Sequence, residues 1–175
     1  QYDAAMRVRR LFGNESALMD RMIAVRGELA EREEAAGSDA LKKQIAAVDE
    51  KLDAVRKRIV ATTEGGAITG EERLREHTDT LYGAIMSYDG APAAYQVERI
   101  AVLESELAGI DAEFNAVLNQ ELPALNSALE ASGLPEVEVP PATAAVADSG
   151  PRSGDSSGRD ADGNEAETYH SLPTS

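Results

Sequence analysis

Large apolar residues recur along residues 97–129 at steps of three and four, with Ala, Glu, Gln, Asn and Asp between them. This spacing places the large apolar side chains in one stripe along a single long helix. Such a stripe must be buried against partner helices, so the pattern predicts a bundle. The residues of the stripe are Ile100, Leu103, Leu107, Ile110, Phe114, Val117, Leu118, Leu122, Leu125 and Leu129.

The same pattern predicts helices over residues 3–36, 39–62, 71–88 and 92–131. Their apolar residues form heptad-like seams of the kind found in coiled coils. The seams of the first three helices consist of Val8, Leu11, Leu18, Met22, Val25 and Leu29, interrupted by the polar Glu15; of Leu41, Ile45, Val48, Leu52, Val55 and Ile59; and of Leu74, Leu81, Ile85 and Tyr88.

Four residues should punctuate these helices. Gly37 is placed to end the first, and Ser38 is a good N-cap for the second. Gly83 lies inside the third, which is unfavourable by about 1 kcal/mol relative to Ala, so we expect another backbone to approach closely there. Pro123 lacks an amide hydrogen and crowds the preceding turn, so we expect a kink or short break near residues 120–123.

The sequence therefore predicts an all-α fold, an antiparallel bundle of three to four long helices. At 1.5 Å per residue the four helices are roughly 51, 36, 27 and 60 Å long. The combined length of the second and third helices matches the length of the fourth. An up-down four-helix bundle and a three-rod bundle, in which the second and third helices form one interrupted rod, both fit these lengths.

From residue 136 the composition changes to Ser, Gly, Asp, Ala and Pro with few large aliphatic residues. Such a segment buries too little apolar surface to offset its loss of conformational entropy. We therefore expect a bundle domain over residues 1–135 and a disordered acidic tail over residues 136–175. Within the tail, Val137 and Val139 could still pack on the end of the bundle.

The net charge of −15 bears on possible partners. An acidic surface repels nucleic-acid phosphate and anionic lipid, so we expect neither as a partner. The sequence also lacks a stretch of roughly 18 consecutive apolar residues that could span a bilayer. Because the chain begins at Gln1 without Met, we expect it to be a piece of a longer protein.

No catalytic, cofactor-binding or metal-binding residue is predicted. A carboxylate-bridged di-metal bundle needs Glu-x-x-His on two helices, whereas Leu74 lies three residues before His77. His170 falls in the predicted tail, which gives no basis for a Ser-His-acid set. If Gly163 is aligned with the invariant glycine of a calcium loop, Gly158 and Tyr169 occupy positions that require Asp and Glu.

Four segments resemble the C-terminal helical region of exported microbial proteins with BNR-repeat or sortilin-type β-propellers, which are often labelled glycosyl hydrolases. The D-G-A-P turn and the L-P-x-L-N-x-x-L…G-L-P ending are the most specific elements of the resemblance. It covers about residues 2–137, and no functional residue transfers with it. The segments are YDAAMRVRRL (2–11), LKKQIAAVDEKLDAVRKRI (41–59), LYGAIMSYDGAP (81–92) and ELPALNSALEASGLPEV (121–137).

The resemblance implies a non-catalytic accessory module that packs on an upstream β-propeller or mediates assembly, in an extracellular or periplasmic location. One alternative is a supporting domain of a BNR-type glycoside hydrolase whose active site lies upstream. Another is a free-standing coiled-coil adaptor. Phe12, Met19 and Ile23 lie beside the first seam rather than in it, so they are the predicted interaction face.

Overall fold

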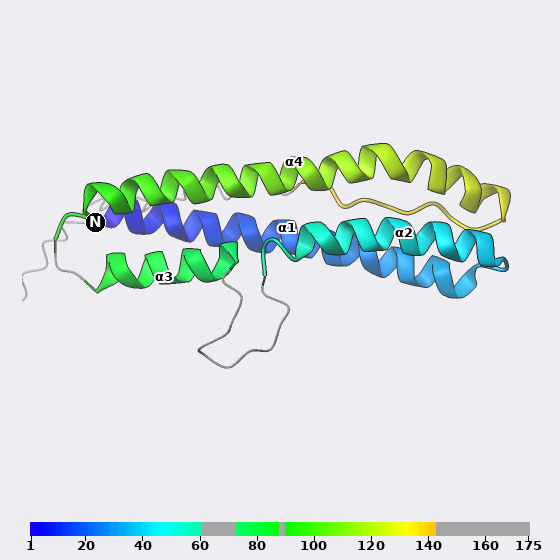
Figure 1. Ribbon diagram of the computed structural model, residues 1–175, viewed down its shortest axis with the longest axis horizontal. Coiled ribbons are helices and arrows are strands. Elements are labelled where there is room, and N and C mark those ends of the chain that lie inside the picture. Colours follow the sequence, from blue (N-terminus) through cyan, green and yellow to red (C-terminus); the bar gives the residue numbers. More distant parts are fainter. Residues whose placement is uncertain (61–72, 88–89, 143–175) are drawn as a thin grey trace, which may run out of the picture.

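The computed structural model describes residues 1–60, 73–87 and 90–142, and these form an all-α bundle (Figure 1). The described residues contain four helices and no strand. The predicted all-α bundle is thus confirmed. The helices are α1 (Tyr2–Ala35), α2 (Asp39–Arg56), α3 (Leu74–Met86) and α4 (Ala94–Ala131).

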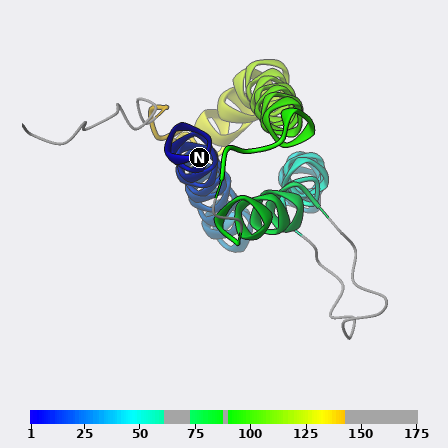
Figure 2. The ribbon, with the colours of Figure 1, turned by 90° about the vertical axis from the view of Figure 1, so that its left-hand side faces the viewer.

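The four helices form three rods rather than a four-helix bundle. In the described part of the chain, α2 and α3 each pack on α1 and on α4 but not on each other. They follow one another along the same side of the molecule (Figure 1), and the end view shows α3 in front with α2 further back (Figure 2). α1 and α4 run in parallel and contact each other, and α2 and α3 run in the opposite direction alongside both.

Backbone hydrogen bonds join the two short helices. After α2 ends, the carbonyl of Arg58 accepts from the Leu74 amide at 3.5 Å, and the carbonyl of Ile59 accepts from the Arg75 amide at 3.1 Å. A continuous helix would make these same bonds if residues 61–72 were absent, because each amide would then lie four residues after its acceptor. α2 and α3 are therefore two parts of one rod.

The buried seam continues across this junction. When residues 61–72 are left out of the count, the step from Ile59 to Leu74 is three residues, and the steps to Thr78, Leu81 and Ile85 are four, three and four. All five side chains are buried. The apolar face of α3 thus has the register that an uninterrupted α2 would have.

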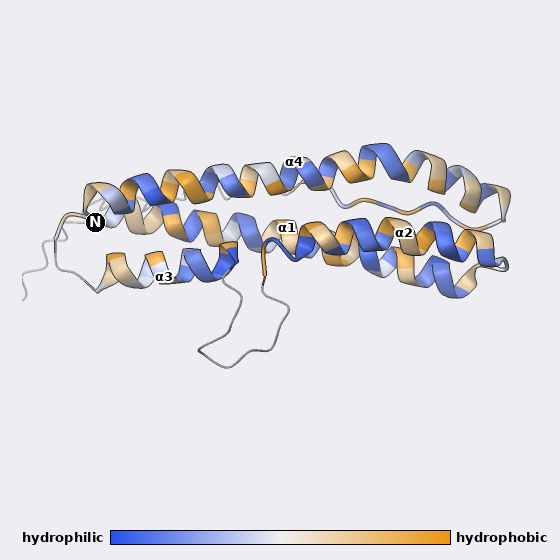
Figure 3. Ribbon diagram, in the orientation of Figure 1, coloured by the Kyte–Doolittle hydropathy of each residue, from blue (hydrophilic) through white to orange (hydrophobic). Residues whose placement is uncertain are grey.

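The core runs the length of the bundle. Nine of the ten stripe residues in α4 are buried and Val117 packs partly buried against them, so the predicted register of α4 is correct. Figure 3 shows the hydrophobic residues alternating with hydrophilic ones along every helix. No helix in the described ranges is both long enough and apolar enough to cross a membrane.

The helix ends follow from local sequence. The Ser38 side chain accepts from the Leu41 amide at 3.3 Å, as predicted for an N-cap. At the end of α4, Gly133 has φ +73°, and its amide donates to the carbonyl of Glu130 at 2.9 Å. The Leu134 amide donates to the carbonyl of Leu129, also at 2.9 Å. This Schellman arrangement reverses the chain direction.

Several local predictions need correction. α4 continues through Pro123 without the break expected near residues 120–123, although its ribbon bends over the C-terminal part (Figure 1). A Cβ added at Gly83 would meet nothing within 4 Å, so the expected close backbone approach is absent. The second helix ends at Arg56 rather than at residue 62, and turns continue to Val60.

The predicted tail divides at Ala142. Residues 136–142, expected to begin the disordered segment, lie along the bundle in the described structure. The rest of the predicted tail, residues 143–175, lies outside the described residues. So do residues 71, 72 and 88 of the predicted third helix, and with them Tyr88 of its predicted seam.

Candidate interaction surfaces

The predicted interaction face on α1 is mostly covered by the bundle itself. Phe12 packs edge-on against Tyr82 of α3, with ring centroids 6.2 Å apart and planes at 79°. Met19 is part of the core at 9% exposure, whereas Ile23 is 57% exposed. α1 has neighbours on two sides, so it needs a wider apolar stripe than a two-helix seam. Of the three residues, Ile23 alone is freely available to a partner.

A different set of exposed apolar side chains gathers at one end of the bundle. This end combines the first turn of α1, the last turn of α3 and the first turns of α4 (Figure 1). The Gln1 side chain ties it together by donating to the carbonyl of Ile85 at 3.0 Å. We call it the entry end. Its exposed large apolar residues are Tyr2 at 69%, Met86 at 52%, Tyr95 at 68%, Val97 at 40% and Val102 at 51% exposure.

The second candidate surface is the groove between α1 and α4, where residues 134–142 run back along the bundle (Figure 1). We call this extended segment the strap. Arg32 donates from Nε to the carbonyl of Pro135 at 3.0 Å and from Nη2 to the carbonyl of Glu136 at 3.1 Å. Further along α1, Arg21 donates from Nε to the carbonyl of Pro140 at 3.1 Å. α1 thus holds the strap by its backbone.

α4 binds the strap from the opposite side of the groove. The Val137 amide donates to Oδ1 of Asn126 at 3.0 Å, and the Val137 side chain is only 5% exposed. The predicted packing of Val137 on the bundle is thus observed, whereas Val139 remains 37% exposed. Val137 is therefore the apolar anchor of the strap.

The spacing of the two arginines matches the spacing of the carbonyls that they bind. Arg21 and Arg32 are 11 residues apart, which is roughly 16 Å along a helix. Pro135 and Pro140 are five residues apart, which is also roughly 16 Å along an extended chain. Arg32 follows Leu29 by three residues and so occupies a seam position. A cation at a seam position is the sequence signal that could have predicted the contact between Arg32 and the strap, which was not predicted.

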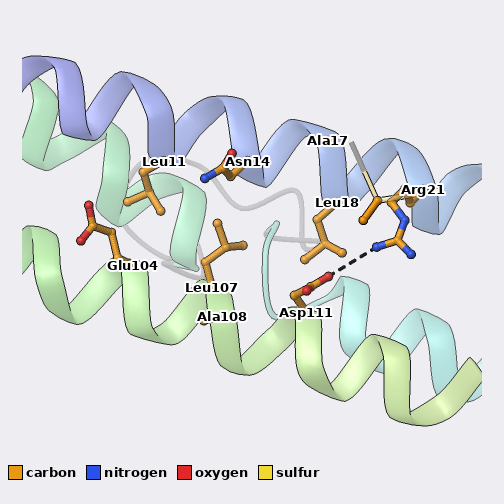
Figure 4. Close-up of a pocket in the computed structure, with 10 residues that line it drawn as sticks. Leu11, Asn14, Ala17, Leu18, Arg21, Glu104, Leu107, Ala108 and Asp111 are labelled. Carbon is orange, nitrogen blue, oxygen red and sulfur yellow. Dashed lines mark hydrogen bonds and ion pairs between the residues drawn. The ribbon is translucent and has the colours of Figure 1, made fainter. Parts of the chain in front are cut away.

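Beyond the strap, the groove opens into a cavity of about 250 Å³ (Figure 4). Its floor is apolar, and polar side chains surround it. Glu104 lies at one end of the cavity and pairs with Arg7 at 2.7 Å. Arg21 closes the other, lying 3.5 Å from Asp111 and 5.2 Å from the centroid of the Phe114 ring. The lining residues are Leu11, Asn14, Ala17, Leu18, Arg21, Glu104, Leu107, Ala108, Asp111 and Ala142.

A polar pair lies inside the core where α2 gives way to α3. The Glu15 side chain is 0% exposed, and its Oε1 is 2.6 Å from Oγ1 of Thr78. Burial raises the pKa of the Glu15 carboxyl, which the Thr78 hydrogen bond and Arg75 partly oppose. The sequence identified Glu15 as an interruption of the seam but not Thr78 as its partner.

The described residues contain no group of three or more His, Asp or Glu side chains placed to hold a metal ion. The surfaces above are therefore the features from which a function can be argued. No family model, curated protein or solved structure matches this chain. The resemblance to BNR-repeat proteins thus stays a prediction from sequence.

Proposed function

We propose that this chain is a non-catalytic accessory module that docks on a neighbouring domain through the entry end of its bundle. The neighbour implied by the sequence resemblance is a β-propeller of the BNR or sortilin type. The observation that carries the proposal is the placement of exposed apolar side chains. Among the residues that the structure describes, five of the seven exposed large apolar residues lie at the entry end; the other two, Ile23 and Val139, lie elsewhere.

The chemistry of this end suits an interface between domains. Such interfaces bury about 600–1,500 Å² and are less apolar than permanent ones. Tyrosines such as Tyr2 and Tyr95 are common at interfaces, because the ring supplies apolar area and the hydroxyl can remain hydrated. The entry end combines exposed apolar side chains from three helices, α1, α3 and α4. In contrast, Ile23 is the one exposed large apolar residue that the described part of α1 has outside the entry end.

The rest of the rod supports a scaffold role. Its core runs the length of the bundle and is mostly aliphatic, with the Glu15–Thr78 pair buried within it. Ion pairs join the helices at the surface. Arg26 of α1, for example, binds Asp49 at 2.6 Å and Asp53 at 2.8 Å on α2. Such a bundle holds the entry end at a fixed position relative to the far end, roughly 57 Å away for the 38 residues of α4.

The test is to express the coding region directly upstream of residue 1 as a separate polypeptide and titrate it with this chain by calorimetry. We expect association that is weakened at least tenfold by the double variant Met86→Gln/Tyr95→Ser. Both side chains are exposed, so the fold should persist. Ile23→Ser is the matched control and should bind like the unmodified chain.

Two outcomes would contradict the proposal. Weakening by Ile23→Ser but not by the double variant would assign docking to the side of α1. Absence of association at high concentration would exclude docking on that neighbour. A glycosidase screen of this chain alone tests the non-catalytic role, and turnover that is lost when one of its acids is replaced would contradict that role.

A further inference from the structure

We propose that the groove between α1 and α4 is a binding site for an extended peptide, and that it takes the strap of a second copy of this chain in exchange for its own. Exchange of straps would give a closed dimer. The inference concerns a different surface from the entry end and stands independently of the proposed docking.

The groove recognises its occupant through backbone groups. Arg21 and Arg32 bind three strap carbonyls, and Asn126 binds the one strap amide with a side-chain acceptor. The Val137 side chain supplies the buried apolar contact. These contacts require an extended chain with a small aliphatic residue at one position, and they are the same whether that chain is covalently attached or not.

The strap is well suited to bind as a unit. Pro135, Pro140 and Pro141 fix three of its φ angles and remove three amide donors that would otherwise need partners. A segment of this kind loses little conformational entropy when it binds in an extended form, which is the basis of proline-rich peptide recognition.

The connection to α4 supplies a hinge. The strap turns back on its own bundle at Gly133, whose φ of +73° is the one positive φ in the described residues. If Gly133 adopts an extended conformation instead, the strap continues past the end of α4. It can then enter the groove of a second bundle that faces the first end to end.

The direction of the strap is correct for such an exchange. Within one chain the strap runs antiparallel to α4 (Figure 1). When two bundles are placed end to end, with the C-terminal ends of their α4 helices facing each other, the two α4 helices point in opposite directions. A strap that continues from the first bundle therefore runs antiparallel to the α4 of the second. The arrangement has two-fold symmetry and each groove makes its usual contacts, which is the general reason that exchange of identical segments has a low free-energy cost.

Gly133→Val is the first test in the full chain. A β-branched residue disfavours positive φ, so the variant should destabilise the intramolecular turn and favour exchange. We expect the dissociation constant of the dimer, measured by sedimentation equilibrium, to fall by roughly tenfold or more, since two hinges are relieved in each dimer. Gly27→Val on the exposed side of α1 is the control and should leave the constant unchanged. A folded Gly133→Val chain that is monomeric at every concentration would overturn the inference.

Complementation gives a second test. In one full chain, Arg32→Ala/Asn126→Ala impairs the groove and leaves the strap intact; in another, Val137→Asp impairs the strap and leaves the groove intact. We expect each to be monomeric alone and the mixture to contain a 1:1 dimer. Arg7→Ala is the control for the groove variant, because Arg7 pairs with Glu104 away from the strap. When Arg7→Ala replaces the groove variant in the mixture, we expect no 1:1 dimer. A mixture that stays monomeric while both chains remain helical would contradict the inference.

A peptide measurement covers the case in which a groove variant fails to fold. A fluorescently labelled peptide of residues 134–142, LPEVEVPPA, is titrated into the Val137→Asp chain and followed by anisotropy. Saturable binding that unlabelled peptide displaces would support the inference. No binding would overturn it.

Discussion

The hydroxyl oxygen of Thr78 lies 2.6 Å from Oε1 of Glu15 and 2.9 Å from the carbonyl oxygen of Leu74. A hydroxyl has one hydrogen, so beside an ionised Glu15 it can donate to only one of these acceptors at a time. A protonated Glu15 satisfies both contacts: the carboxyl donates to Thr78, and Thr78 donates to Leu74. Burial acts in the same direction by disfavouring the charged form. The geometry therefore favours a neutral Glu15.

The first prediction is that Glu15 makes the bundle less stable as the pH rises. The ordinary pKa of this carboxyl is 4.5, and folding raises it. The folded chain therefore binds more protons than the unfolded chain between the two pKa values. The contribution of Glu15 is complete below the unfolded pKa and is lost as the pH rises through the folded pKa. Of the charged side chains that act on it, Arg75 lowers the pKa and Glu76 raises it, both from α3.

Glu15→Gln should accordingly increase the free energy of unfolding at pH 8, by roughly 1–2 kcal/mol, because a buried carboxyl must at that pH be either kept protonated or ionised without full hydrogen bonding, and Gln carries no charge. The difference should shrink toward pH 4.5. Urea unfolding at several pH values measures it, and Glu50→Gln on an exposed position of α2 is the control. If Glu15→Gln destabilised the bundle more at pH 8 than at pH 5, Glu15 would be ionised in the folded chain and the prediction would be wrong.

The second prediction has the opposite sign and concerns Asp53 on α2. Hydrogen bonds from Lys57 and Arg56, together with the charge of Arg26, lower the pKa of Asp53 from 3.8 to about 2. The stabilisation is present above the unfolded pKa and is lost as the pH falls through about 2. Asp53→Asn should lower the free energy of unfolding at pH 7 by on the order of 1–2 kcal/mol.

This effect should diminish when unfolding is measured near pH 2. Asp20→Asn, at an exposed position of α1, is the comparison and should have little effect at either pH. An equal loss of stability at pH 7 and at pH 2 would mean that the ion pairs of Asp53 are not its cause.

The third prediction is that residues 61–72 can be removed without disturbing the core. Joining Val60 to Arg73 keeps the hydrogen bonds from Leu74 and Arg75 and the seam through Ile85 in register. We expect the free energy of unfolding to rise by about 2 kcal/mol, because the entropy of closing the connection is no longer lost on folding.

A deletion one residue shorter, residues 61–71, is the matched control. It should rotate the seam of α3 by about 100° relative to α2 and expose its apolar side chains. Thermal unfolding by circular dichroism separates the two variants. Equal melting temperatures would show that α2 and α3 are not a single rod.

The fourth prediction concerns two exposed helical glycines. A Cβ at Gly83 or at Gly109 would meet nothing within 4 Å, so replacement by Ala should raise the free energy of unfolding by about 1 kcal/mol at each site. Gly133→Ala should instead be destabilising, because of its positive φ. Denaturant titrations of the three variants test both signs, and a loss of stability at Gly83 would revive the close approach predicted from sequence.

The helices and their buried faces could be predicted from the sequence, because the period of apolar residues is a local property of each helix. The seam of α4 from Ile100 to Leu129 was correctly predicted in type, register and approximate bounds. The N-cap at Ser38 was predicted for the same reason, since it depends on neighbouring residues alone. Helix lengths narrowed the topology to two arrangements but did not choose between them.

Features that depend on contacts between residues distant in sequence became visible in the tertiary structure alone. That structure has the three-rod arrangement, because α2 and α3 bury their seams against the same two helices. It covered Phe12 and Met19, since α1 has two neighbours, and it placed Thr78 beside Glu15 across 63 residues of sequence. The strap depends on the spacing of Arg21 and Arg32 matching that of carbonyls more than 100 residues away. The period within one helix does not encode a match of that kind.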